Sequence, residues 1–513
     1  MINKQSHQSS QVVIAGAGAA GCVLASRLTE DPTISVLLLE AGPDYPDPVQ
    51  VPSDLVDGGR NSMIHHDWGF IHKPNFRSGI FPFPRGKVVG GSSAVNTCIG
   101  LRGQPYDYDE WNDLGLTDWS WDTCLPYFKK LERDLDFQNE HHGSEGPLPL
   151  RRYKESEWVE WQRAFVKACL GFGYPYCEDS NETGSTGVGP HAMNKIKGRR
   201  ISAAEAYLTP NVRARDNLKI QPFTLINRVM FENGTVQGVE VITSQGHETV
   251  TAKHVFLSSG AIQTPGILMR SGLGPERELN RLGVEVKVNL KGVGERLLDH
   301  PGVALFFAPR WMAPIGRHDP LIQTCLRYNS GEPDQPSDML LQPGSKVPFP
   351  SVDTPLVSLM SAIGKPKGYG RLEWKTLDPF ARPHIHSRLL AHHEDRNKAV
   401  DVLLLAYDLY RSSELANIAV PFIPRPWFLK KQSRLDRWVK LLCGSGYHPS
   451  GTAPMGTSDD PMAVCDQRGS VYGVQGLQVV DASLMPTIPS SNIHLPTLMM
   501  AEKLADVWKQ ELS

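Results

Sequence analysis

The apolar and polar positions at the start of the chain predict a strand, a helix and a second strand. Residues 11–15 form an apolar run of strand length, and residues 19–28 have the composition of a buried helix. Residues 35–42 form a second apolar run that ends beside an acidic residue. Two strands joined by a helix indicate a parallel sheet and therefore an α/β fold.

The turn between the first strand and the helix carries Gly16, Gly18 and Gly21, spaced G-x-G-x-x-G. The first glycine permits a tight turn, the second permits close approach of a pyrophosphate, and the third lets the helix pack closely on the strand. Glu40 ends the second strand, 19 positions after Gly21, where an acidic residue is expected to bind ribose hydroxyls. This order predicts a dinucleotide site. Its position at the start of a long chain favours FAD over NAD.

A second Gly-rich segment spans residues 82–96 and leads into residues 98–103. It offers many backbone amides with little side-chain bulk, which suits close approach to a phosphate or an isoalloxazine ring.

Between residues 100 and 300 the pattern alternates between helices and strands. The turn between the first two strands of this region is expected at Asn233-Gly234. We expect helices over 121–132, 158–171 and 262–270, and strands over 218–229, 236–243 and 254–261.

Residues 300–440 differ in character, because prolines are frequent, strands are short, and one long helix is expected over 395–411. We interpret this region as a separate sheet with helices that covers the cofactor. Residues typical of the nucleotide-binding part return near 445, so that domain is discontinuous in sequence. The predicted fold class is α/β: an FAD-binding Rossmann-like domain and a second, α+β substrate domain built on an antiparallel sheet. We expect the FAD-binding domain to comprise 1–155, 196–300 and 441–513, the last with the catalytic residues, and the substrate domain to comprise the cap segment 156–195 and residues 301–440.

Composition and charge exclude several classes of function. The formal net charge of −2 argues against nucleic-acid binding, which needs a clustered basic excess. No apolar run is long enough for a transmembrane helix, and residues 1–10 lack the apolar core of a signal peptide, so a cytoplasmic location is expected. The eight cysteines are scattered, and no metal site is predicted.

Four blocks, in order along the chain, resemble the glucose–methanol–choline (GMC) family of flavoprotein oxidoreductases. They are the glycine motif with Glu40, residues 86–96, residues 260–274, and a C-terminal block that starts at His448 and continues through 479–486 and 492–497. The resemblance extends over essentially the whole chain. One departure is Gly100, where an aromatic residue or alanine is usual.

The resemblance implies that the chain binds FAD. Members with covalently attached flavin have a histidine where this chain has Val95, so non-covalent FAD is expected. The residues that the glycine motif and the resemblance together assign to the cofactor are Gly16, Gly18, Ala19, Ala20, Gly21, Glu40, Ala41, Val89, Gly90, Gly91, Ser92, Asn96, Thr97, Cys98, Ile99, Ile226, Asp481, Ala482, His494 and Thr497.

The resemblance also assigns the catalytic residues, His448 as the base and Asn492 as its partner. Histidine suits proton abstraction because its unperturbed pKa lies near neutral pH, whereas an amide can only hold the substrate oxygen in place. His494 occupies a position beside the flavin pyrimidine, where a cationic ring would stabilise reduced flavin. The alternative assignment makes His494 the second catalytic residue in place of Asn492.

The expected reaction is oxidation of an alcohol CH–OH group to a carbonyl by hydride transfer to flavin N5. The substrate is a small-molecule primary alcohol, with aromatic and furan-like alcohols among the candidates, and the electrons pass to O2 or another acceptor. Two alternatives on the same fold are a lyase of the hydroxynitrile lyase type and a flavin fatty-acid photodecarboxylase. Candidate walls of the substrate pocket are Phe306, Phe307, Trp311 and Trp427, and Gly446 and Cys98 are candidates beside the flavin.

Overall fold

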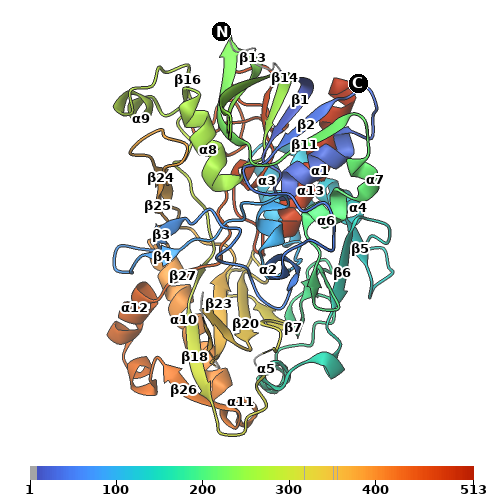
Figure 1. The fold of residues 1–513 in the computed structure, drawn as a ribbon. Coiled ribbons are helices and arrows are strands. Elements are labelled where there is room, and N and C mark those ends of the chain that lie inside the picture. Colours follow the sequence, from blue (N-terminus) through green and yellow to red (C-terminus); the bar gives the residue numbers. More distant parts are fainter. Residues whose placement is uncertain (1–7, 317, 350–351, 355) are drawn as a thin grey trace.

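A computed structural model of the chain describes residues 8–316, 318–349, 352–354 and 356–513. The largest sheet lies at the end of the molecule where both termini lie, and a second large sheet lies at the opposite end (Figure 1). Each sheet has its own hydrophobic core.

The first sheet combines a parallel part with an antiparallel part. Its strand order is β11 (Leu218–Gln221), β2 (Val36–Leu39), β1 (Gln8–Ala15), β14 (Gly246–Leu257), β13 (Thr235–Thr243) and β12 (Leu225–Glu232), with β28 (Leu477–Val479) also paired to β14. All four residues of β2 are buried, as expected for a strand covered on both faces. Helices α1 (Ala19–Leu28) and α13 (His494–Leu512) pack against each other beside this sheet (Figure 1).

The single strand expected over 218–229 is wrong, because the chain breaks there into β11 and β12. Pro222 has no backbone N–H for the sheet, and Phe223 adopts a left-handed φ of 53°. The break sends the two strands to opposite edges of the same sheet.

The second sheet is antiparallel throughout, in the order β26 (Ala419–Ile423), β18 (Ala304–Pro309), β23 (Val357–Ile363), β20 (Met339–Gly344), β19 (Thr324–Tyr328) and β7 (Gly187–Pro190). Helices α5 (Glu160–Gly171) and α10 (His393–Tyr410) pack against it. Its edge strand β7 comes from the segment 156–195, far from the other strands in sequence. The predicted fold class is confirmed, and the domain boundaries stay a prediction.

The remaining elements are short or connect the two sheets. The other helices are α2 (Ser53–Val56), α3 (Pro105–Asp113), α4 (Trp121–Leu131), α6 (Ala203–Tyr207), α7 (Pro210–Arg213), α8 (Gly260–Arg270), α9 (Glu276–Arg281), α11 (Ser413–Ala416) and α12 (Gln432–Leu441). Smaller sheets contain β3 (Ile71–Lys73), β4 (Phe81–Pro82), β5 (Glu132–Asp134), β6 (Leu148–Arg152), β8 (Ala192–Met193), β9 (Lys195–Ile196), β10 (Arg199–Arg200), β15 (Leu273–Gly274), β16 (Val288–Asn289), β17 (Pro301–Gly302), β21 (Val347–Phe349), β22 (Val352–Thr354), β24 (Arg371–Glu373), β25 (His384–His386) and β27 (Gly444–Ser445). Over the described part of the chain, none of the helices has both the length and the apolar character needed to cross a bilayer.

Candidate active site

The two Gly-rich loops meet beyond the carboxyl end of β1. Gly16 has a φ of 107°, and a Cβ there would lie 2.6 Å from the carbonyl oxygen of Ser258. A Cβ on Gly91 would lie 2.7 Å from Cα of Gly18. The backbone N–H of Gly90 donates to the carbonyl of Ala17 over 2.7 Å. Side chains are therefore excluded where these loops touch, and backbone amides remain at the surface between them.

Glu40 holds the first of these loops. Its carboxylate accepts hydrogen bonds from the backbone N–H groups of Ala17, at 3.0 Å, and Gly42, at 2.8 Å. Burial raises the pKa of Glu40 to about 7, against the opposing effect of these two bonds. The side chain also lines the cavity, where a carboxylate oxygen with a free lone pair can accept from a ribose hydroxyl.

One cavity extends from the glycine turn to His448, and most of the expected site residues line it. These are Gly16, Gly18, Ala19, Ala20, Glu40, Ala41, Gly91, Ser92, Asn96, Thr97, Ile99, Ile226, His448, Asp481, Ala482, Asn492, His494 and Thr497.

Four expected cofactor residues, Gly21, Val89, Gly90 and Cys98, are not part of the cavity lining. A Cβ on Gly21 would lie 2.0 Å from the carbonyl oxygen of Gly16, so this glycine serves the contact between helix and strand. The backbone N–H groups of Val89 and Gly90 donate to the carbonyls of Pro43 and Ala17, and these bonds hold the second loop in place. Cys98 is buried in a separate small apolar cluster with a left-handed φ of 64°.

Asp481 lines the cavity, but its carboxylate is already engaged with the protein. One oxygen accepts from the backbone N–H of Gly260 and the hydroxyl of Thr264, and the other accepts from the backbone N–H of Ser483. Asp481 therefore positions the start of α8, and its contact with a cofactor is limited to the remaining lone pairs.

Further residues line the same cavity and were not foreseen from the sequence. They include Asn61, Trp68, Phe70 and Tyr447, which lie outside the recognisable motifs, Arg85, which lies within the second Gly-rich segment, and Gln263, which lies within the third block. Only the positions of Arg85 and Gln263 in these segments could have indicated them.

The expected aromatic walls of the substrate pocket are wrong. Phe307 is buried in the core of the second sheet and stacks on Tyr410. Trp311 is 94% exposed and Trp427 is 50% exposed. Neither these residues nor Phe306 lines the cavity. Phe306 and Phe307 are neighbours on β18 and so face opposite sides of the sheet, and the sequence alone does not show which side faces the cavity.

His448 lies in a short loop after β27 and is held by its backbone. Its N–H donates to Oδ1 of Asp299 over 2.9 Å, and Arg85 Nη2 donates to the carbonyl of Tyr447 over 2.7 Å. The side chain is half-buried in the cavity wall. Nε2 of His448 and Nδ2 of Asn492 are 3.1 Å apart. The two residues predicted to be catalytic are therefore brought together from positions 44 apart in sequence.

The imidazole of His300 contacts that of His448, and no sequence motif pointed to His300. The two Nδ1 atoms are 2.8 Å apart, and the rings meet edge to face. Burial lowers the pKa of His300 to about 4. Burial, together with His300 and Arg85, lowers the pKa of His448 well below its usual value. Both imidazoles are therefore neutral at neutral pH.

Three buried polar atoms in the cavity lack a hydrogen-bond partner among the described residues. They are Oδ1 of Asn61, Oδ1 of Asn492 and Nε2 of His494. Buried polar atoms are normally satisfied, so these atoms indicate where a ligand binds. Burial lowers the pKa of His494 to about 4, and the neutral ring remains able to donate one hydrogen bond.

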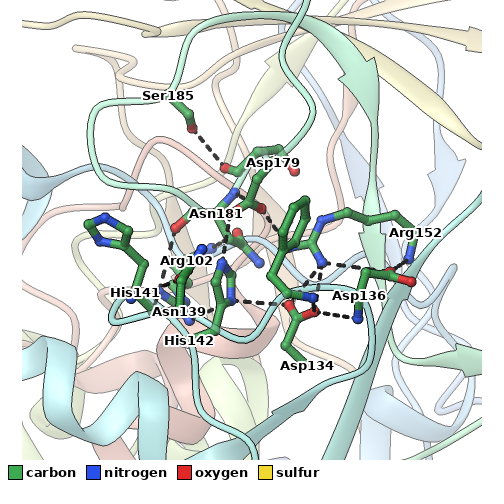
Figure 2. Close-up of polar contacts among 12 residues, drawn as sticks. Arg102, Asp134, Asp136, Asn139, His141, His142, Arg152, Asp179, Asn181 and Ser185 are labelled. Atoms are coloured by element: carbon green, nitrogen blue, oxygen red, sulfur yellow. Dashed lines mark hydrogen bonds and ion pairs between the residues drawn. The ribbon is translucent and has the colours of Figure 1, made fainter.

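A buried cluster of ionic side chains around His142, Asp134 and Asp179 lies apart from the cavity (Figure 2). It contains the only fully buried trio that resembles a metal site in the described ranges, formed by Glu132, Asp134 and His142. His142 contacts Glu132 at 3.0 Å, Asp134 at 3.1 Å and Asp179 at 2.6 Å. Two arginines pair with the same carboxylates: Arg102 with Glu132, and Arg152 with Asp134 and Asp179.

The charges of this ion cluster balance without a metal. Burial alone would lower the pKa of His142, but the hydrogen bonds with its three carboxylate partners raise it to about 10. Three cationic side chains thus face three buried carboxylates, and the partly exposed Asp136 lies 3.8 Å from Arg152. The side chain of His142 is 1% exposed, although the residue lies in the loop between β5 and β6.

Comparison with known proteins identifies the family. Two family models described as GMC oxidoreductase match residues 10–302 and 366–501. The chain belongs to the GMC oxidoreductase family. The resemblance in the four sequence blocks is thereby confirmed, and this GMC oxidoreductase is an enzyme of a family that binds FAD and oxidises alcohols.

Relatives of this GMC oxidoreductase align over nearly its full length. A 5-(hydroxymethyl)furfural oxidase from Methylovorus sp. (strain MP688) is 36% identical, over 96% of this chain and 97% of the relative. A mitochondrial choline dehydrogenase from Mus musculus is 34% identical, over 97% of this chain and 89% of the relative. The crystal structure of pyridoxine 4-oxidase from Mesorbium loti superposes with a TM-score of 0.89 at 30% identity, covering 98% of this chain and 99% of the other.

Proposed function

We propose that this GMC oxidoreductase oxidises a primary alcohol to the corresponding carbonyl compound, with His448 as the base. The observation that carries the proposal is the pairing of His448 Nε2 with the Asn492 amide, 3.1 Å apart, in the same cavity as the dinucleotide turn. Catalysis of this kind needs a base and a cofactor-binding surface that face one space.

The cavity residues fit FAD. The amides exposed by the glycine loops suit its pyrophosphate, and Glu40 suits its ribose. FAD, when bound, supplies the hydride acceptor. Val95 lines the cavity where covalently flavinylated relatives have histidine, and valine cannot form that bond, so we propose non-covalent binding.

His448 can take the hydroxyl proton of the substrate because its pKa is lowered and the ring is neutral. The Asn492 amide can donate to the substrate oxygen and so direct the hydroxyl hydrogen towards His448. Its Oδ1 has no partner among the described residues, so the amide retains capacity for a ligand. We assign the positioning role to Asn492 in preference to His494, because the hydrogen bond to the base comes from Asn492.

For the substrate we propose a primary alcohol carried on an aromatic or furan-like ring. Two relatives with high coverage are named as oxidases of 5-(hydroxymethyl)furfural and of pyridoxine, both ring compounds. Aromatic side chains of Trp68, Phe70 and Tyr447 line the cavity here, and aromatic faces favour ring ligands. The electrons pass to O2 or to another acceptor.

A panel of alcohols tests this function. The purified, flavin-loaded protein is mixed with each alcohol and an artificial electron acceptor, in air and anaerobically. We expect acceptor reduction with ring-bearing primary alcohols and little with secondary aliphatic ones. Cleavage of a cyanohydrin without acceptor reduction would indicate the lyase, and light-dependent loss of CO2 from a fatty acid would indicate the photodecarboxylase.

A further inference from the structure

The imidazole of His300 has a fixed arrangement of its proton. It is buried, and its Nε2 lies 3.0 Å from the carbonyl oxygen of Gly364 and 2.9 Å from that of Pro489. A carbonyl oxygen only accepts hydrogen bonds, so Nε2 of His300 carries the proton. The neutral ring therefore has its lone pair on Nδ1.

That lone pair faces Nδ1 of His448 at a distance of 2.8 Å. Two bare nitrogens repel at this distance, so Nδ1 of His448 carries a proton and donates it to His300. A neutral His448 then has its lone pair on Nε2, the atom that lies 3.1 Å from the Asn492 amide. Resting on the proposed function above, we propose that His300 is a positioning residue that holds His448 in the tautomer whose basic nitrogen, Nε2, faces the substrate.

The charged groups nearby support the neutral pair. Lys365 approaches His300 and disfavours a second proton on its ring, and Arg85 acts likewise on His448. The Asp299 carboxylate accepts from the backbone N–H groups of His300 and His448 and from the hydroxyl of Ser445. Asp299 thus fixes the two backbones. The neutral imidazole of His300 lies beside the base, in the position that the Asp carboxylate occupies in a Ser-His-Asp triad.

Gly446 permits the contact between the rings. A Cβ there would lie 2.9 Å from Nδ1 of His448 and 3.1 Å from Cβ of His300. Its backbone N–H donates to the carbonyl of His300 over 2.8 Å, which ties the loop to the residue that directly precedes β17. Without His300, Nδ1–H of His448 loses its buried acceptor, and the ring gains by moving its proton to Nε2. The nitrogen facing the substrate is then no longer a base.

Two substitutions separate this role from simple packing. His300→Leu removes both ring nitrogens, whereas His300→Asn can present Oδ1 to Nδ1–H of His448 and donate from Nδ2 to a backbone carbonyl. The holoenzyme of each variant is labelled with 15N-histidine, and the nitrogen shifts of His448 are assigned by comparison with His448→Ala. Flavin content and thermal unfolding are measured on the same samples.

At pH 7 we expect a protonated Nδ1 and a bare Nε2 on His448 in the wild type and in His300→Asn, and the reverse in His300→Leu. The rate of anaerobic flavin reduction by alcohol should fall about 10- to 100-fold in His300→Leu, in the range usual for partners that orient a functional histidine, and recover in His300→Asn.

A protonated Nε2 on wild-type His448 would overturn the proposal, and so would a His300→Leu holoenzyme that keeps the wild-type tautomer. If His300→Leu fails to retain flavin, the wild-type spectrum and His300→Asn still decide the point. The nitrogen shifts can be measured without turnover. If His448 has the expected tautomer but no alcohol reduces the flavin, the proposed function is refuted and the tautomer assignment stands.

Discussion

At the scale of single residues, the proposed reaction needs a base that is already free of its proton. Burial, His300 and Arg85 all lower the pKa of His448. A base is active above its pKa, so a lowered pKa extends its active range towards acid.

The pH dependence of flavin reduction follows from this lowered pKa of His448. We expect the rate constant of anaerobic reduction to be flat between about pH 6.5 and pH 8 and to fall only below the ordinary histidine range. Stopped-flow absorbance at saturating alcohol measures it. A rate that rises about tenfold per pH unit across neutrality would mean that His448 is protonated there, contrary to its surroundings.

Asn492 and His494 can be distinguished by what each alanine variant changes. Asn492→Ala should slow flavin reduction by about 10- to 100-fold with unchanged flavin content, because it removes the amide that orients the substrate oxygen. His494→Ala should instead shift the reduction potential of the flavin or weaken its binding. The opposite pattern, with the potential moved by Asn492→Ala and only the rate moved by His494→Ala, would make His494 the second catalytic residue.

At the scale of elements, the site depends on how closely the two Gly-rich loops approach. Gly91 has a φ of 53°, and its missing Cβ leaves the room that Gly18 occupies. We expect Gly91→Ala to lose most of its flavin, read from the ratio of flavin to protein absorbance. Gly171→Ala at the end of α5 is the matched control, because nothing lies within 4 Å of its Cβ position. Equal flavin content in the two variants would contradict the close-approach argument.

The ion cluster around His142 joins β5, β6 and the segment near Asp179 (Figure 2). His142→Leu leaves three buried carboxylates with two cations, so the free energy of unfolding in urea at pH 7 should fall by about 3–5 kcal/mol. His141→Leu is the matched control, since its side chain is 32% exposed. A loss of similar size in both variants would mean that the ion cluster contributes nothing specific.

The stability difference between the wild type and His142→Leu should depend on pH. The folded pKa of His142, about 10, lies above its unfolded value of 6.5. Its stabilisation is therefore complete below pH 6.5 and is lost as the pH rises towards 10. The stability difference between wild type and His142→Leu should shrink over that interval.

At the scale of the whole molecule, much of the architecture could be predicted from the sequence. The β1–α1–β2 unit is local, and its hydrophobic period and glycines fix it within about thirty residues. The boundary between β11 and β12 was missed, although Pro222 marks it, because the apolar pattern continues across the break. Residues that the chain brings together from afar were harder to predict.

His300 illustrates that difficulty. Its role depends on two backbone carbonyls, of Gly364 and Pro489, that lie 64 and 189 positions away. No local period or spacing records such a contact. The same holds for Trp68 and Phe70, whose place in the cavity wall arises from the packing of loops, and for the exposed Trp311, which the sequence alone does not distinguish from a pocket wall.

The most direct measurement compares wild type with His448→Ala, each loaded with FAD and mixed anaerobically with a ring-bearing primary alcohol while the oxidised-flavin absorbance is followed. The account predicts rapid bleaching in the wild type and a loss of at least about 100-fold in the variant, in the range for removal of a general base, with FAD content unchanged. Bleaching of the variant at the wild-type rate would contradict it.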